Sequence, residues 1–214
     1  IFLCKSIFKI VKVGLYFGTF NPIHVGHLII ANYMCEFTDL DQVWLVVTPQ
    51  NPLKQKKSLL ADFHRLALVK EAIDDNRRLR ASDIEFKMQK PNYTAHTLAH
   101  LIENHPENDF ALIMGEDNLR GFHKWYNYEE ILAKHKIYVY PRVLTPQEES
   151  ELEKIKQGQL DEFKNHPNVS LCADAPVMKV SSSFIRSAIK AKKDVRYLLS
   201  EPVFRYVDEM KFYQ

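Results

Sequence analysis

GTFNPIHVGHL, residues 18–28, is the stretch that decides the fold class of this chain. It follows the apolar run VKVGLYF at residues 11–17 and leads into a helix-forming stretch at residues 28–37. A short β-branched and aromatic run predicts a buried strand, and Gly18 and Pro22 predict a turn after it. The order strand, turn and helix is the first half of a βαβ unit, which implies a parallel sheet.

The rest of the chain continues this alternation of short apolar runs and longer amphipathic stretches. Strands that alternate with helices favour right-handed crossovers and a parallel sheet covered on both faces. We therefore expect a Rossmann-like α/β fold in a single domain at residues 11–214, after an extension at residues 1–10. Further strands are expected at residues 42–48, 79–86, 109–115, 136–141 and 168–173, and further helices at residues 61–73, 94–103, 128–133, 182–190 and 203–212. The helix at residues 61–73 rests on apolar residues at roughly helical spacing, namely Phe63, Leu66, Ala67, Val69 and Ile73.

Composition and charge place the chain among ordinary globular proteins. Of its 214 residues, 46% are hydrophobic and 26% are charged. No apolar run approaches the length of about 20 residues that spans a bilayer. The net charge of +2 is too small to favour nucleic-acid binding, so neither a membrane nor a nucleic-acid partner is expected. The three cysteines, Cys4, Cys35 and Cys172, lie far apart and are odd in number, which suits a reducing cytoplasm.

Two histidines at the start of the first helix are candidates for binding phosphate. In an open parallel sheet, ligands bind beyond the carboxyl ends of the strands, and the turn after the first strand lies there. Gly18 would let a phosphate approach the backbone, and a helix N-terminus offers N–H donors and a partial positive charge. His24 and His27 are three residues apart and share one helix face. Both imidazoles can therefore donate to phosphate oxygens and stabilise the charge that develops during phosphoryl transfer.

Three other interpretations of this turn are weaker. The P-loop pattern G-x-x-x-x-G-K-[ST] and the dinucleotide pattern G-x-G-x-x-G are both absent. A zinc site would need further ligands, and no cysteine or carboxylate at ligand spacing accompanies the two histidines. A chance pair of surface histidines would not explain the strand, glycine, proline and second glycine that surround them in order.

A second anion site is expected towards the C-terminus. Ser181, Ser182 and Ser183 precede a helix, and Arg186 follows one turn later. Hydroxyls at a helix start, together with a guanidinium, can bind an anion. Taken alone, the segment favours an ordinary serine N-cap followed by a solvated arginine. Its pairing with the histidine turn favours the anion site.

The two segments resemble the motifs of the HxGH nucleotidyltransferase superfamily. Residues 18–27 are similar to its signature G-[TS]-F-[DN]-P-x-H-x-G-H. Residues 180–186 (VSSSFIR) are similar to its I-S-S-T-x-I-R motif, with valine and serine in place of the usual isoleucine and threonine. The resemblance implies a nucleotidyltransferase domain in which His24, His27 and Arg186 are catalytic. It also implies nucleotide contacts from Gly18, Thr19, Phe20, Ser181, Ser182, Ser183, Ile185, Gly115 and Asp117.

Three further segments narrow the acceptor. PNYTAHTL (residues 91–98), GEDNL (residues 115–119) and FHKWYNYEEIL (residues 122–132) resemble segments of bacterial nicotinate mononucleotide adenylyltransferases. The end of the chain, residues 197–213, is also similar. The resemblance implies that the Trp125 ring stacks on a pyridine ring and that Asp117 accepts from ribose hydroxyls. The implied acceptor contacts are Lys54, Tyr93, Thr94, Trp125 and Tyr126.

The implied reaction joins ATP and nicotinate mononucleotide. The acceptor phosphate attacks the α-phosphorus of ATP directly, so catalysis consists of positioning and charge stabilisation. Mg²⁺ would be bound through the ATP phosphates, with no metal cage built from protein side chains. The alternatives are the same fold acting on nicotinamide mononucleotide, on phosphopantetheine or in cytidylyl transfer, a nucleotide-binding module without catalysis, and a zinc-binding structural domain. Trp125 and the Tyr93–Thr94 loop argue against acceptors that lack a pyridine ring.

Overall fold

The strands of the chain assemble into a parallel sheet. The computed structural model describes residues 10–49, 59–142 and 162–214. Within these ranges the strand order is β3-β2-β1-β4-β5-β6, and every neighbouring pair is parallel. The strands are β1 (Val11–Gly18), β2 (Gln42–Val47), β3 (Leu79–Ser82), β4 (Asn108–Gly115), β5 (Ile137–Tyr140) and β6 (Val169–Leu171). This is the strand order of a Rossmann fold, and it confirms the predicted fold class.

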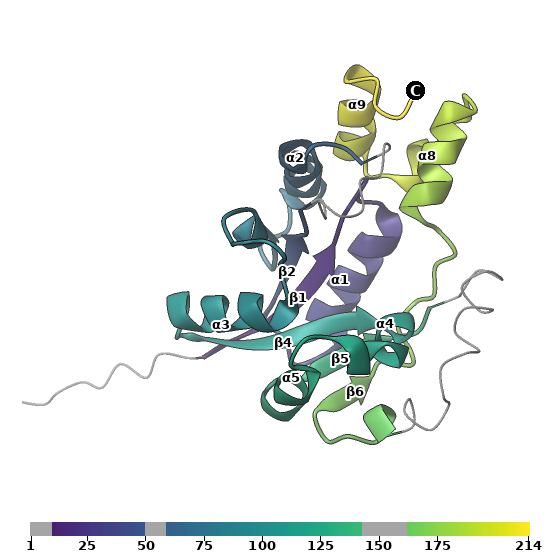
Figure 1. The fold of residues 1–214 in the computed structure, drawn as a ribbon. Helices are drawn as coiled ribbons and strands as arrows, with labels where there is room; N and C mark the ends of the chain where they lie inside the picture. The colour runs from purple at the N-terminus through teal and green to yellow at the C-terminus, as the bar shows by residue number, and fades with distance from the viewer. Residues whose placement is uncertain (1–9, 50–58, 143–161) are drawn as a thin grey trace, which may run out of the picture.

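Helices connect the strands and follow the last of them (Figure 1). The described helices are α1 (Val25–Phe37), α2 (Asp62–Ile73), α3 (Thr94–Asn104), α4 (Glu116–Arg120), α5 (Tyr128–Lys134), α8 (Ser182–Lys190) and α9 (Glu201–Glu209). Short 3₁₀ turns lie at Ile84–Phe86, Phe122–Lys124 and Arg196–Leu198. Of the described helices, none is long and apolar enough to cross a membrane.

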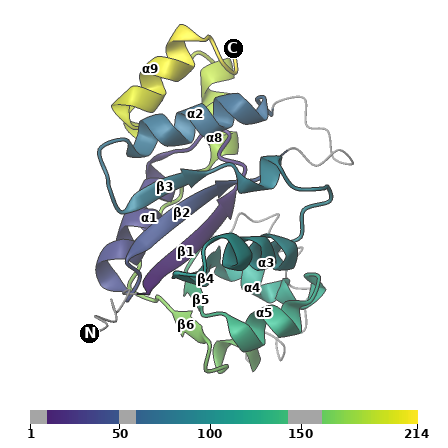
Figure 2. The ribbon, with the colours of Figure 1, turned by 90° about the vertical axis from the view of Figure 1, so that its left-hand side faces the viewer.

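Successive side chains of β1 point to two different layers of helices. Val13 and Leu15 pack in one cluster with residues of α3, α4 and α5, whereas Tyr16 packs in another with residues of α1. A third cluster joins Leu45 and Val47 of β2 to α2, α8 and α9, which lie together at one end of the molecule in both views (Figures 1 and 2). Helices therefore cover both faces of the sheet, as the sequence predicts.

The structure corrects the bounds of several expected elements. The strand expected at residues 79–86 ends at Ser82, and a 3₁₀ turn follows. The turn points the buried Glu85 carboxyl at α3, where Thr97 Oγ1 donates to it at 3.0 Å. The first helix begins at Val25 rather than at residue 28, so His27 lies inside its first turn.

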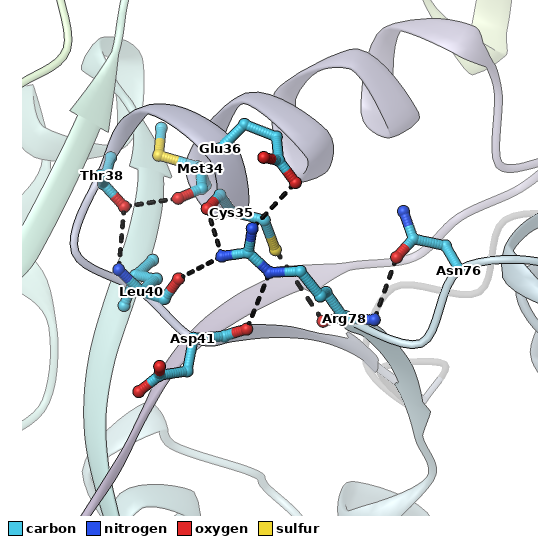
Figure 3. A network of polar contacts seen from close by, with 8 residues as sticks. All are labelled: Met34, Cys35, Glu36, Thr38, Leu40, Asp41, Asn76 and Arg78. Atoms are coloured by element: carbon cyan, nitrogen blue, oxygen red, sulfur yellow. Dashed lines mark hydrogen bonds and ion pairs between the residues drawn. The ribbon is translucent and has the colours of Figure 1, made fainter.

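One arginine closes the C-terminal end of α1 (Figure 3). The last carbonyls of a helix have no partner within it. The Arg78 guanidinium donates to the carbonyl of Cys35 in the last turn and pairs with the Glu36 carboxylate at 2.8 Å. It also donates to the carbonyls of Leu40 at 2.7 Å and Asp41 at 3.0 Å. Because Arg78 immediately precedes β3, these contacts fix α1 against the sheet and help to place its other end, which carries the histidines.

Candidate active site

A cavity of about 700 Å³ opens at the carboxyl ends of the strands, where the order of the sheet reverses between β1 and β4. Its walls come from the loop after β1, the start of α1, the end of β5 and the segment that leads into α8. The candidate residues that line it are Gly18, Thr19, Phe20, His24, His27, Thr94, Ser181, Ser182, Ser183 and Arg186. The structure thus brings together the two motifs that the sequence predicts to bind phosphate.

Other candidates from the sequence lie outside the cavity lining. Gly115 ends β4, Asp117 lies in α4, and Ile185 is buried in the core between α2, α8 and α9. Tyr93, Trp125 and Tyr126 lie near the N-terminal end of α3 and between the turn at Phe122–Lys124 and α5. Lys54 lies outside the described residues.

His24 and His27 lie side by side at the start of α1. His24 is the N-cap residue, with an extended backbone, and His27 lies three residues later in the first turn. Their rings stack with a centroid distance of 3.8 Å and an interplanar angle of 27°. The His24 backbone N–H donates to His27 Nδ1 at 3.2 Å, so the neutral His27 ring carries its proton on Nε2. That Nε2–H is the donor that His27 can offer to a ligand.

Their surroundings favour the neutral form of both imidazoles near pH 7 in the ligand-free protein. Burial, together with the nearby Arg142 guanidinium, lowers the pKa of His24 to about 4. Burial is also the main cause that holds the pKa of His27 well below its usual range, followed by repulsion from a protonated His24 and from Arg142. An anionic ligand beside the two rings would favour their protonated forms and raise both pKa values. The pair is therefore suited to gain positive charge when phosphates arrive.

These pKa shifts predict acid sensitivity of the fold. In the unfolded chain His24 takes up a proton near pH 6.5, whereas in the folded chain it does so only near pH 4. Between these values the unfolded state binds more protons, so the free energy of unfolding should fall by about 3 kcal/mol as the pH drops from about 6.5 to about 4. His27 acts in the same direction. Urea unfolding at pH 7.5, 6 and 5 measures the effect.

A matched variant isolates the contribution of His24 to this pH dependence. His24→Gln cannot be protonated in this range, so its stability should depend less steeply on pH than that of the unsubstituted chain. Parallel curves for the two proteins would contradict the assignment, because the acid sensitivity would then come from other groups.

The serine–arginine segment (residues 180–186) forms hydrogen bonds with the loop that carries the histidines (residues 18–28, the histidine loop). Ser182 Oγ donates to the Pro22 carbonyl at 2.9 Å, and Arg186 Nη1 donates to the Asn21 carbonyl at 2.8 Å. Arg186 Nη2 also donates to Ser183 Oγ at 3.1 Å. Ser181 is the N-cap of α8 and accepts from a backbone N–H in its first turn at 3.2 Å. The N-terminal ends of α1 and α8 therefore face one cavity, each with partial positive charge.

Gly26 makes this approach possible. A Cβ at residue 26 would lie 2.8 Å from Val180 Cγ1 and 3.1 Å from the His24 ring. Any larger residue would push the segment before α8 away from α1 or displace His24. Gly18 makes a different approach possible, because a Cβ at residue 18 would lie 2.9 Å from the ring of the buried Phe20 in the same loop. The absence of a side chain at Gly26 thus allows the two motifs to pack against each other.

An aromatic group lies at the N-terminal end of α3. The rings of Tyr93 and Tyr126 have centroids 5.0 Å apart, and His96 lies 5.1 Å from Tyr126. Trp125 packs edge-to-face on the buried Phe122 at 5.4 Å and is itself half-buried against the core. Thr94 is the first residue of α3, so its backbone N–H is one of those without a partner inside the helix.

Asp117, the candidate partner of ribose hydroxyls, forms an ion pair in the ligand-free protein. Arg142 Nη1 donates to Asp117 Oδ2 at 2.5 Å. Arg142 lines the cavity, so the pair lies at its edge. A nucleotide that bound to either side chain would have to share or replace this contact.

Known proteins resemble this chain along most of its length. The sequence pattern of the cytidylyltransferase-like family matches residues 15–188. Proteins from Christiangramia forsetii and Flavobacterium johnsoniae, each named "Probable nicotinate-nucleotide adenylyltransferase", are 53% identical to it over 95% of its length. The matches cover 98% and 99% of those proteins. The chain belongs to the nicotinate-nucleotide adenylyltransferase family.

Solved structures share the fold. The nicotinic acid mononucleotide adenylyltransferase of Plasmodium falciparum, in its complex with NaAD, superposes with a TM-score of 0.71 over 95% of this chain and 97% of that chain. The same protein in its complex with APC gives a TM-score of 0.70. Both comparisons are at 16% sequence identity, so they extend the fold of the adenylyltransferase family to distant sequences.

Several cavity residues of this adenylyltransferase family member do not stand out in the sequence. Tyr16 and Tyr140 line the cavity, with their hydroxyls 3.2 Å apart, and burial raises the pKa of both. Glu85 and Arg142 also line it. A signal was present for the tyrosines, because each is a polar aromatic residue near the carboxyl end of an otherwise apolar strand. Glu85 and Arg142 lie just after strands, where charged residues are too common to be informative.

Proposed function

We propose that this chain transfers the adenylyl group of ATP to nicotinate mononucleotide, giving nicotinate adenine dinucleotide and pyrophosphate. One observation carries the proposal. The histidine pair and the serine–arginine segment face one cavity and are joined by the hydrogen bonds from Ser182 to Pro22 and from Arg186 to Asn21. The relatives named for this activity, at 53% identity, and the Plasmodium falciparum protein bound to NaAD support the choice of substrates.

Positioning and charge stabilisation supply the catalysis in this proposal. The acceptor phosphate attacks the α-phosphorus of ATP, the bond from that phosphorus to the bridging oxygen breaks, and pyrophosphate leaves with the electron pair. The acceptor phosphate is already a nucleophile at neutral pH, so no covalent enzyme intermediate is needed. His24, His27 and Arg186 donate to the phosphate oxygens as negative charge builds on them. The N-terminal ends of α1 and α8 hold the triphosphate.

The acceptor ring is assigned to the aromatic group near α3. In this arrangement Trp125 and its neighbours Tyr93 and Tyr126 contact the pyridine ring, and the backbone N–H groups of Thr94 and Tyr126 bind its carboxylate. Asp117 exchanges Arg142 for ribose hydroxyls when the nucleotide binds. From its resemblance to the family, Lys54 is proposed to contact a phosphate group.

Mg²⁺ is assigned to the bound triphosphate. Among the described residues, no group of three or more histidine, cysteine, aspartate or glutamate side chains could hold a metal ion. In this proposal the ATP phosphates and water hold the ion, which would neutralise charge on the phosphates. We assign the protein to the cytoplasm, where the free thiols of Cys35 and Cys172 would stay reduced.

Pyrophosphate release with a panel of acceptors tests the proposal. ATP and Mg²⁺ are supplied with nicotinate mononucleotide, nicotinamide mononucleotide or phosphopantetheine, and a parallel reaction contains CTP and glycerol 3-phosphate. We expect rapid release with nicotinate mononucleotide and the dinucleotide as product. Equal rates with both pyridine nucleotides would contradict the preference for the acid. Release only with another acceptor would contradict the assignment of the aromatic group, and ATP binding without release would contradict catalysis altogether.

A further inference from the structure

A hydrogen bond joins the last turn of the chain to the histidine loop. The Tyr213 hydroxyl donates to Asn21 Oδ1 at 2.8 Å, across 192 residues of sequence. Burial raises the pKa of Tyr213 well above its usual range, so the hydroxyl keeps its proton and remains a donor. Asn21 is itself buried, with 3% of its surface exposed, and lies three residues before His24. Tyr213 is half-buried, so the contact is partly shielded from solvent.

Asn21 is the residue on which several contacts of the loop converge. Its Oδ1 also accepts from the Leu60 backbone N–H at 3.1 Å. Its carbonyl accepts from Arg186 Nη1 at 2.8 Å. The side chain of Asn21 thus bonds to Tyr213 and Leu60, while its backbone carbonyl bonds to the catalytic candidate Arg186.

Tyr213 does not touch the cavity. It is absent from the cavity lining, and its ring packs with Phe212 in the apolar cluster between α2, α8 and α9. An effect of its hydroxyl on ligands is therefore indirect: the hydroxyl bonds to Asn21, and the Arg186 guanidinium lies near enough to act on its pKa. The ring and the hydroxyl are separable, because phenylalanine keeps the ring in the cluster and removes only the donor.

We propose that Tyr213 is a positioning residue, whose hydroxyl fixes Asn21 and thereby sets the place of Arg186 relative to His24 and His27. This inference rests on the proposed adenylyl transfer, in which these three side chains act on the same phosphates. A looser Asn21 would leave Arg186 a range of positions, and misplaced donors stabilise a transition state less well.

Tyr213→Phe tests the inference. Loss of this hydrogen bond should lower kcat for adenylyl transfer by about threefold to tenfold. KM for nicotinate mononucleotide should stay unchanged, because the aromatic group at α3 is untouched. ATP affinity, measured by calorimetry without acceptor, should fall by a similar factor, and this measurement does not depend on turnover. Unchanged kcat and unchanged ATP affinity would overturn the inference.

A matched control separates positioning from stability. Tyr206→Phe removes a hydroxyl from the same apolar cluster, where that hydroxyl lies 3.2 Å from Nδ1 of His64 in α2. Both variants should lower the melting temperature slightly, but only Tyr213→Phe should change kcat. Equal losses of kcat in the two variants would assign the effect to stability and overturn the inference.

A double substitution tests the route through Arg186. In an Arg186→Ala background, Tyr213→Phe should leave ATP affinity unchanged, because the side chain it positions is gone. An undiminished effect in that background would contradict the route. If the unsubstituted chain binds ATP but does not transfer it, the proposed function fails, whereas the affinity comparison still decides the role of Tyr213.

Discussion

Replacing His24 and His27 together by alanine is expected to lower kcat for adenylyl transfer by about 10³-fold or more, while the chain keeps its fold. The two rings stack at the start of α1, and the tautomer of His27 directs its Nε2–H to a ligand. Their donors would act on charge that exists fully only in the transition state, so their loss should appear in kcat more than in KM. Each single substitution should cost about 10²- to 10³-fold, because one donor of this kind contributes that much elsewhere.

Single-turnover and steady-state kinetics with nicotinate mononucleotide measure the effect of these substitutions. His100→Ala is the matched control, because His100 is an exposed residue on the surface of α3 and should be replaceable at no cost. Circular dichroism and the melting temperature show whether each variant is folded. A folded double variant with near-normal turnover would contradict the catalytic role of the pair.

Short-range patterns in the sequence predict most of the fold and the centre of the candidate site. The strands are apolar runs bounded by turn residues, and their alternation with helices fixes the parallel order. The histidine turn and the serine–arginine segment are each contiguous, so their chemistry is visible in a few letters. Their meeting at one cavity follows from the rule that ligands bind where the strand order reverses.

Long-range polar contacts could not be predicted in this way. The bond from Tyr213 to Asn21 and the pair of Asp117 with Arg142 join segments far apart in the sequence, and no local pattern marks them. Helix α2 shows a different limit. Its apolar spacing includes Phe63, which is 65% exposed, whereas the charged Arg65 between the apolar residues is fully buried. A prediction from apolar spacing places every charged residue on the exposed face of a helix. It therefore places Arg65 in solvent, although its side chain is buried.

The buried guanidinium of Arg65 has partners on three segments around the cavity. One terminal nitrogen donates to the Thr19 carbonyl at 2.6 Å and to the Thr48 carbonyl at 2.7 Å. Nε donates to the Leu60 carbonyl at 3.1 Å, and the other terminal nitrogen pairs with Asp62 at 2.5 Å. Thr19 and Thr48 line the cavity, so Arg65 fixes the start of the histidine loop from behind.

Arg65→Met is therefore expected to destabilise the folded chain by about 3 to 5 kcal/mol, because three carbonyls lose a charged donor and Asp62 loses the cation beside it. Urea unfolding measures the loss. Arg65→Lys should recover only part of it, since one ammonium on a flexible stem cannot reproduce the planar fork that spans Thr19, Thr48 and Leu60. Lys70→Ala, an exposed position on the same helix, should change stability by less than about 0.5 kcal/mol. An Arg65→Met variant as stable as the Lys70→Ala control would show that the loop carbonyls find other partners. In that case the contacts of Asn21 and α8, and not those of Arg65, would fix the conformation of the histidine loop.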